Sequence, residues 1–176
     1  MNKNIAIIGG GNLGTSIAYG LVKSKYCNPQ KITVTRRKIN FLYNLKKDLK
    51  INISDNNIET VIKSDIIIIA VQPKQIKNVL KEIKSFLKDK IQISTVTGIA
   101  TSNILNIIDD VNNIPVFRVM PNTAISIRES MTCICHKNAT TEQINIITEM
   151  FSKLGKVAYI DEELMSSATV LAASGI

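Results

Sequence analysis

The chain has 176 residues and a net charge of +8, with 45% hydrophobic and 20% charged residues, a composition typical of a globular protein with its own core. Its lysines are spread along the chain without a dense basic block or interleaved aromatic residues, which argues against a nucleic-acid-binding protein. The longest apolar run, residues 66–71, is too short to cross a bilayer. Three cysteines and no secretory signal indicate a reducing compartment, so we expect a cytoplasmic protein without nucleic-acid or membrane partners.

The first predicted strand runs directly into a glycine-rich turn. Residues 5–8 are apolar, and Gly9, Gly11 and Gly14 follow with GxGxxG spacing before a helix-compatible run, residues 15–23. In a dinucleotide-binding turn, the first glycine permits the tight turn, the second lets the pyrophosphate approach the backbone, and the third lets the helix pack closely on the sheet. The helix N-terminus offers free N–H groups and the positive end of its dipole to phosphates. The order of strand, glycines and helix therefore predicts a dinucleotide site.

The second strand, predicted over residues 31–35, ends in Arg36 and Arg37. Sites specific for NAD usually place Asp or Glu here to bind the ribose 2′-hydroxyl, but the first acidic residue of this chain is Asp48. Two guanidinium groups would instead bind a 2′-phosphate. The pattern favours NADP(H) as the cofactor. The alternative is that both arginines are solvated residues at the start of a surface helix.

The rest of the chain alternates between strands and helices. Strands are predicted at residues 51–53, 65–71, 91–95, 114–120, 130–135 and 156–160, and helices at residues 39–49, 57–63, 76–87, 102–108 and 141–154. The β-branched run from 65 to 71 is typical of a parallel strand buried on both faces. The alternation predicts an α/β fold, a Rossmann-type doubly wound and mainly parallel sheet.

A group of thiols and an imidazole near residue 133 is the one pattern that could suggest a metal site. Cys133 and Cys135 precede His136, the only histidine in the chain. However, Met131, Cys133 and Cys135 alternate as one face of a strand, and no second ligand pair exists to complete a tetrahedral site. We therefore expect core cysteines and no metal.

From residue 161 onward the pattern is helical and rich in small residues. Small side chains on a helix suit close packing against another helix or a ligand. We expect residues 1–160 to form the dinucleotide-binding domain and residues 161–176 to form the first helix of a second, all-helical domain. The remainder of that domain is expected to lie outside this sequence.

Five ordered motifs resemble those of the pyrroline-5-carboxylate reductase family. They are Gly9 to Gly14, Ala70 to Pro73, Ser94 to Ile99, Arg118 to Thr123 and Thr169 to Gly175. The fourth matches the family's R-x-M-P-N-T intact, whereas the others carry substitutions, such as Gln72 for a lysine and Thr97 for an alanine. The resemblance covers essentially the whole chain. It implies NADPH-dependent reduction of 1-pyrroline-5-carboxylate to L-proline by a homo-oligomer built from dimers.

The resemblance also implies which residues contact the cofactor. Several family contacts follow the carboxyl ends of the strands. On the adenosine side they correspond to Asn12 and Leu13 in the glycine loop, Arg36 and Arg37 at the adenosine phosphate, and Asn57 near the adenosine ribose. On the nicotinamide side they correspond to Ala70, Val71, Gln72 and Pro73, with Asn122 at the nicotinamide end. Without the other motifs, Pro121 and Asn122 would be interpreted as a strand-ending turn. Catalytic residues stay unassigned, because the family's substrate loop lies beyond Ile176.

Two hypotheses of other kinds stay open. One is another small Rossmann reductase, such as an F420-dependent NADP reductase or an imine reductase, and the other is a non-catalytic NADP-binding module. Reduction of a cyclic imine fits the residues present, because protonation of its nitrogen already makes the acceptor carbon electrophilic. The protein then has mainly to hold the hydride donor near that carbon. The absence of paired carboxylates in the candidate loops agrees better with this chemistry than with hydrolysis.

Overall fold

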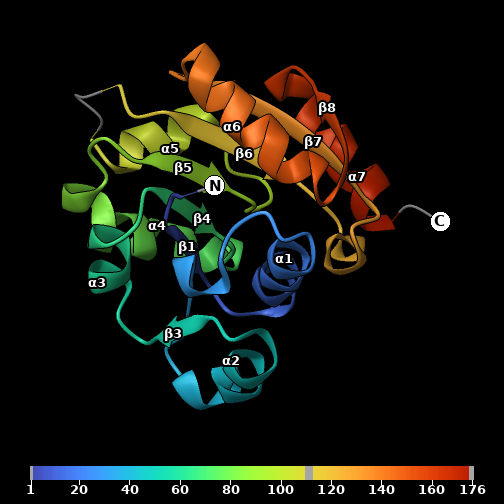
Figure 1. Ribbon diagram of the computed structural model, residues 1–176. Helices are drawn as coiled ribbons and strands as arrows, with labels where there is room; N and C mark the ends of the chain where they lie inside the picture. Colours follow the sequence, from blue (N-terminus) through green and yellow to red (C-terminus); the bar gives the residue numbers. More distant parts are fainter. Residues whose placement is uncertain (1, 110–112, 175–176) are drawn as a thin grey trace.

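The computed structural model describes residues 2–109 and 113–174 and shows a central sheet with helices on both faces (Figure 1). The strands are β1 (Ile5–Ile8), β2 (Ile32–Thr35), β3 (Asn52–Ser54), β4 (Ile66–Ile69), β5 (Ile91–Ser94), β6 (Val116–Met120), β7 (Ser130–Lys137) and β8 (Gly155–Tyr159). The α-helices are α1 (Asn12–Lys23), α2 (Tyr43–Leu49), α3 (Asn57–Ile62), α4 (Pro73–Ile83), α5 (Thr101–Ile107), α6 (Thr141–Ser152) and α7 (Met165–Ser174). Short 3₁₀ turns are η1 (Pro29–Lys31), η2 (Ile39–Leu42), η3 (Lys84–Phe86), η4 (Thr123–Ile127) and η5 (Glu162–Leu164).

The sheet has the strand order β3-β2-β1-β4-β5-β6-β7-β8. The strands from β3 to β6 are parallel, β7 runs antiparallel to β6, and β8 is parallel to β7. The predicted doubly wound, mainly parallel sheet is therefore confirmed. The chain order reverses between β1 and β4, and in such sheets the crevice outside the carboxyl ends of the strands at this switch point binds ligands.

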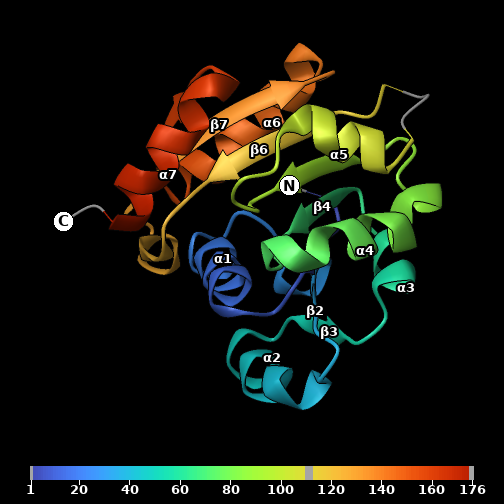
Figure 2. The same cartoon turned by 180° about the vertical axis from the view of Figure 1, so that it is seen from behind.

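Two apolar layers enclose the sheet. Ile5 and Ile7 of β1 face a core built with α1, α2 and α6, whereas Ala6 and Ile8 face a second core built with α3, α4 and α5. Figure 1 shows α1 and α6 on the near face, and Figure 2, from behind, shows α4, α5 and α7 on the other. All four residues of β1 and of β4 are buried, which confirms the prediction for the β-branched run. None of the described helices combines the length and apolarity needed to span a membrane.

The structure corrects several predicted boundaries. Helix α1 begins at Asn12, three residues before the predicted start, because the glycine loop itself supplies the N-cap at Gly11. Helix α4 begins at Pro73, a residue preorganised for the first helical position, rather than near Ile76. The predicted helix over residues 39–49 divides into η2 and α2, as helix termini often tighten into 3₁₀ turns. Gly175, the last residue of the fifth motif, lies outside the described residues.

At Gly14, helix α1 lies close against the glycine loop and β1. A methyl group built on Gly14 would lie 2.1 Å from the carbonyl oxygen of Gly9 and 3.3 Å from a side-chain carbon of Ile7. No rotamer change can relieve the first contact, because it is made by backbone. The α1–β1 packing therefore depends on the absence of a side chain at this position.

We predict that Gly14→Ala lowers the free energy of unfolding by about 1–3 kcal/mol, because the added methyl group forces α1 away from β1. Urea denaturation of the variant measures this loss. Gly11→Ser is the matched control, since no heavy atom lies within 4 Å of its built Cβ and serine is a favoured N-cap residue. Equal stability of the Gly14→Ala variant and the unmodified chain would contradict the packing argument.

Candidate cofactor site

The glycine loop is held between the ends of β2 and β4. The backbone N–H groups of Gly9 and Gly10 both donate to the carbonyl oxygen of Thr35, at 3.2 and 2.7 Å. Gly9 has a φ of +110°, and a Cβ there would lie 2.5 Å from the carbonyl oxygen of Ala70. The chain can make this turn only with glycine at position 9. The structure thus brings Gly9, the end of β2 and the predicted Ala70–Val71 contacts together.

Gly11 is the open position of the loop. It caps α1 in an extended conformation, with a φ of −87°, and nothing lies within 4 Å of a Cβ built on it. The first turn of α1 carries no acidic residue, and no side chain caps it. The N–H groups of the first helical turn have no partners within their own helix. Asn12 and Leu13 therefore present backbone donors beside an open backbone, a geometry suited to an anion.

Arg36 lies at the rim of this loop. Its Nη1 donates to the carbonyl oxygen of Gly10 at 2.9 Å, and its guanidinium carbon lies 4.3 Å from the centroid of the Phe41 ring. Arg37, next along the chain, is exposed and forms no ion pair with the described residues. Within the described part of the chain neither arginine pairs with a carboxylate, so both positive charges remain available to an anionic group at the end of β2.

The Asn57 side chain is already engaged within the protein. Its Oδ1 accepts a hydrogen bond from Thr35 Oγ1 at 2.7 Å, and its Nδ2 donates to Glu82 Oε2 at 3.1 Å. It links the end of β2 to helix α4 next to the loop. The structure thus places Asn57 at the predicted edge of the sheet but adds a supporting contact that the sequence pattern did not indicate.

Gln72 joins the turn after β4 to the start of helix α4. Gln72 is the N-cap of α4, and its backbone N–H donates to the side-chain oxygen of Gln75 at 3.1 Å. The backbone N–H of Gln75 donates in turn to the backbone carbonyl oxygen of Gln72 at 2.8 Å, so Gln72 contributes mainly its backbone to this turn. Ala70 and Val71 remain the part of this turn nearest Gly9.

Asn122 follows β6, at the same edge of the sheet, with β4 and β5 between it and the glycine loop. Its Oδ1 accepts a hydrogen bond from the backbone N–H of Ala124 at 3.2 Å and so caps η4. Its own backbone N–H donates to Ser130 Oγ at 3.3 Å. The side-chain oxygen therefore shapes a turn, as the structural interpretation of this segment predicted.

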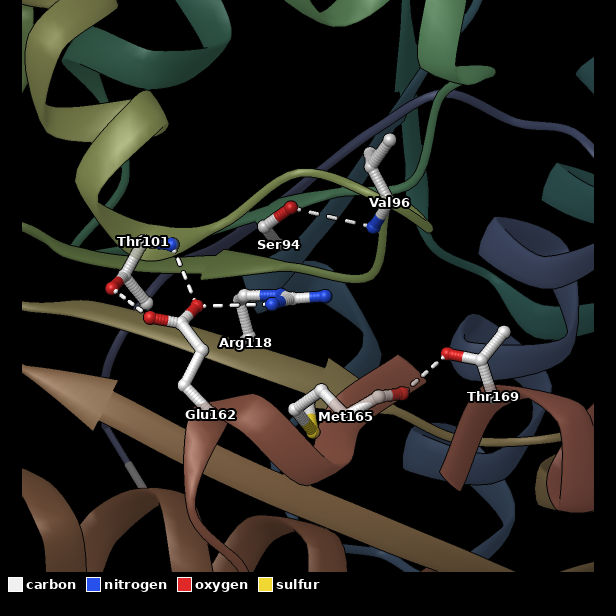
Figure 3. Close-up of polar contacts among 7 residues, drawn as sticks. All are labelled: Ser94, Val96, Thr101, Arg118, Glu162, Met165 and Thr169. Carbon is white, nitrogen blue, oxygen red and sulfur yellow. Dashed lines mark hydrogen bonds and ion pairs between the residues drawn. The ribbon is translucent and has the colours of Figure 1, made fainter. Parts of the chain in front are cut away.

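A partly buried polar cluster near this edge was missed by the sequence analysis (Figure 3). Glu162 accepts two hydrogen bonds from Thr101, from its backbone N–H and its Oγ1, both at 2.7 Å, and forms an ion pair of 3.0 Å with Arg118 Nη1. Partial burial raises the pKa of the Glu162 carboxyl, but the Thr101 hydrogen bonds and the Arg118 charge outweigh it, so that this pKa lies below its ordinary value. Glu162 is thus held as a carboxylate.

A signal for this cluster was present in the sequence. Arg118 stands in the apolar strand Val116–Met120, and a charge buried in such a strand requires a partner. The partner could not be chosen from the pattern, because Glu162 lies between Asp161 and Glu163 in a segment that resembles an exposed helix start.

The cysteines of β7 belong to a small apolar cluster. Cys135 packs with Met120 and Met165, and Cys133 lies against the same group. Burial raises the pKa of the Cys135 thiol to about 11, which keeps it protonated at neutral pH. Across residues 2–109 and 113–174, no three His, Cys, Asp or Glu side chains lie together in a way that could hold a metal ion.

Comparison with known proteins places this geometry in a family. Residues 4–98 match the family model described as NADP oxidoreductase, coenzyme F420-dependent. Pyrroline-5-carboxylate reductase 2 of Dictyostelium discoideum is 39% identical, over 99% of this chain and 63% of its own length. The corresponding reductase of Methanosarcina acetivorans is 33% identical, over 99% of this chain and 64% of its own length. The chain therefore spans just under two thirds of these relatives.

Solved structures agree along nearly the whole chain. The Coxiella burnetii pyrroline-5-carboxylate reductase superposes with a TM-score of 0.91 at 28% identity, covering 99% of this chain and 65% of that one. The Plasmodium falciparum enzyme, solved with NADP bound, gives a TM-score of 0.89 at 25% identity, covering 99% of this chain and 63% of that one. The chain thus belongs to the NADP oxidoreductase, coenzyme F420-dependent, family, and its resemblance to pyrroline-5-carboxylate reductases extends over nearly its full length.

Proposed function

We propose that the protein reduces 1-pyrroline-5-carboxylate to L-proline with NADPH. The observation that carries the proposal is the open backbone at Gly11, at the uncapped N-terminus of α1, with Arg36 and Arg37 at its rim. The choice of substrate is supported by the reductases that are 33–39% identical over 99% of this chain. Because the chain spans 63–64% of those relatives, the activity is proposed for the complete gene product.

Each group of residues has a role in this proposal. Bound NADPH supplies the hydride that the imine carbon accepts. The backbone N–H groups of Asn12 and Leu13 bind the pyrophosphate, and Gly11 leaves room for it. Arg36 and Arg37 bind the 2′-phosphate through charge-assisted hydrogen bonds. The remaining cofactor contacts are assigned to Gly9, Gly14, Asn57, Ala70, Val71, Gln72, Pro73 and Asn122.

The organisation around this site is also proposed. Residues 1–160 form the NADP-binding domain, and residues 161–176 begin a helical domain through which the protein forms homo-oligomers. The small residues of α7, which suit close helix packing, support this division. Three free cysteines support a cytoplasmic location, since thiols persist in a reducing compartment.

One competing function has a specific observation in its favour. The family model that matches residues 4–98 is named for coenzyme F420, so hydride exchange between NADP and a deazaflavin is the second candidate. That model covers only the first part of the chain, whereas the pyrroline-5-carboxylate reductases match along 99% of it. We therefore place the imine reduction first.

The proposed function is tested with the complete gene product. NADPH oxidation is followed at saturating cofactor with 1-pyrroline-5-carboxylate, and in parallel NADP reduction is followed with reduced coenzyme F420. We expect turnover only with the imine, together with rescue of a proline auxotroph. Turnover with the deazaflavin alone would favour the second candidate, and binding without either turnover would indicate a non-catalytic NADP-binding module.

We predict that the chain prefers NADPH to NADH and that the double variant Arg36→Ala/Arg37→Ala loses this preference. Each charge-assisted hydrogen bond to the 2′-phosphate contributes about 1.5–3 kcal/mol. Isothermal titration with both cofactors measures the preference. Lys38→Ala is the control, because it removes an exposed positive charge one residue further along. A preference that survives the double substitution would show that other groups read the phosphate.

We predict that Gly11→Val abolishes NADPH binding while the domain stays folded. The valine side chain would occupy the open space above the loop, where the pyrophosphate must approach the backbone. A φ of −87° is accessible to valine, so the backbone itself does not oppose the substitution. Circular dichroism checks folding and titration checks binding. Near-normal affinity in a folded variant would mean that the loop is only a structural turn.

A further inference from the structure

The segment between β8 and α7 is attached to the sheet through one carboxylate. Glu162 lies in η5, three residues before α7 begins at Met165, and it reaches two elements that precede it by more than forty residues. It accepts both donors of Thr101 at the start of α5 and pairs with Arg118 in β6. This single side chain therefore connects α5, β6 and the beginning of α7.

Burial makes this connection specific. The Arg118 side chain is only 7% exposed, and Glu162 is the one carboxylate that pairs with it among the described residues. Arg118 Nε is buried and has no hydrogen-bond partner among the residues that the structure describes. An uncompensated buried charge is costly. Breaking the Arg118–Glu162 ion pair therefore costs more free energy than breaking an ion pair between two exposed side chains.

The attached helix leads toward the proposed cofactor edge. Met165, at the start of α7, is fully buried against Met120 and Cys135, which fixes the first turn of the helix on β6 and β7. In Figure 3 the chain runs from Glu162 in η5 into α7, which carries Met165 and Thr169, and the segment with Ser94 and Val96 lies across from it. Glu162 and Met165 thus both hold the start of α7 against the sheet, Met165 at Met120, the last residue of β6.

We infer that Glu162 is a positioning residue for the reaction. By joining the start of α7 to Thr101 and Arg118, it fixes the wall that the helix presents to the nicotinamide end of the site. This inference rests on the proposed function, since it assigns the acceptor side of the same site to α7. Hydride transfer depends steeply on the donor–acceptor distance, so a small displacement of this wall lowers turnover.

A purely structural ion pair would behave differently. Its loss would lower the free energy of unfolding, and cofactor binding and turnover would then fall together, in proportion to the folded fraction. Glu162 is remote from the glycine loop in the sheet order, since β6 is separated from β1 by β4 and β5. A positioning role therefore lowers turnover while NADPH affinity is retained.

The test compares Glu162→Gln with Glu163→Gln in the complete gene product. Glu163 is the adjacent, exposed carboxylate. Its substitution removes one negative charge, as Glu162→Gln does, but leaves the contacts of Glu162 with Thr101 and Arg118 intact. For Glu162→Gln we expect NADPH affinity within about twofold of the unmodified protein and a fall in kcat of about tenfold or more. Amide hydrogen exchange should become faster in residues 165–169 of the same variant. The Glu163→Gln variant should match the unmodified protein in all three measurements.

A second variant keeps the test decisive if Glu162→Gln folds poorly. Thr101→Val removes the hydroxyl donor but keeps the backbone donor, and it should lower kcat by about threefold with NADPH affinity retained. If Glu162→Gln does fold, adding Thr101→Val to it should lower kcat no further, because Thr101 acts through the same carboxylate.

The outcomes separate the two proposals. Unchanged kcat in Glu162→Gln, or parallel loss of NADPH affinity and kcat, would overturn the positioning role while leaving the proposed reaction intact. If the unmodified protein has no imine turnover, the proposed function fails. Hydrogen exchange then tests the attachment of α7 by itself: faster exchange in residues 165–169 of Glu162→Gln, but not of Glu163→Gln, supports the attachment, and unchanged exchange refutes it.

Discussion

The contact between Gly14 and Gly9 is the constraint on which the candidate site depends. The two backbones approach so closely that a methyl group on Gly14 would lie 2.1 Å from the Gly9 oxygen. This approach aims the first turn of α1 at the carboxyl edge of the sheet and places Gly11 outside it, with nothing within 4 Å of its missing side chain. The hydrogen bond from Arg36 to Gly10 then brings a positive charge to the same loop. Close packing and an open anion site are thus two consequences of one backbone arrangement.

The features that could be predicted from the sequence are those that local pattern determines. The alternation of β-branched runs with amphipathic segments predicted the doubly wound sheet, because strand and helix periods differ and parallel strands are buried on both faces. The spacing of Gly9, Gly11 and Gly14 predicted the loop. Gly9 and Gly14 meet backbone requirements that a side chain would break, whereas Gly11 leaves open space beside the first turn of α1. Boundaries were less accurate, as at Asn12 and Pro73, where caps rather than hydrophobic patterns determine the helix start.

The features that could not be predicted depend on side chains that are distant in sequence. Glu162 finds Thr101 and Arg118 across 61 and 44 residues, and no local pattern distinguishes it from the neighbouring Glu163. Asn57 likewise bridges Thr35 and Glu82, elements that only the folded sheet brings together. In both cases a buried or partly buried polar group had to find its partner in the tertiary structure. Gln72 departs from the family motif at the N-cap of α4, where its backbone N–H donates to Gln75.

A crystal structure of the protein with NADP tests the central claim most directly. The account predicts that pyrophosphate oxygens lie within hydrogen-bond distance, about 2.7–3.2 Å, of the backbone N–H groups of Asn12 and Leu13. It also predicts that the 2′-phosphate lies against Arg36 and Arg37, with the cofactor passing over Gly11. Phosphates bound at another part of the sheet, with the N-terminus of α1 unoccupied at saturating NADP, would contradict it.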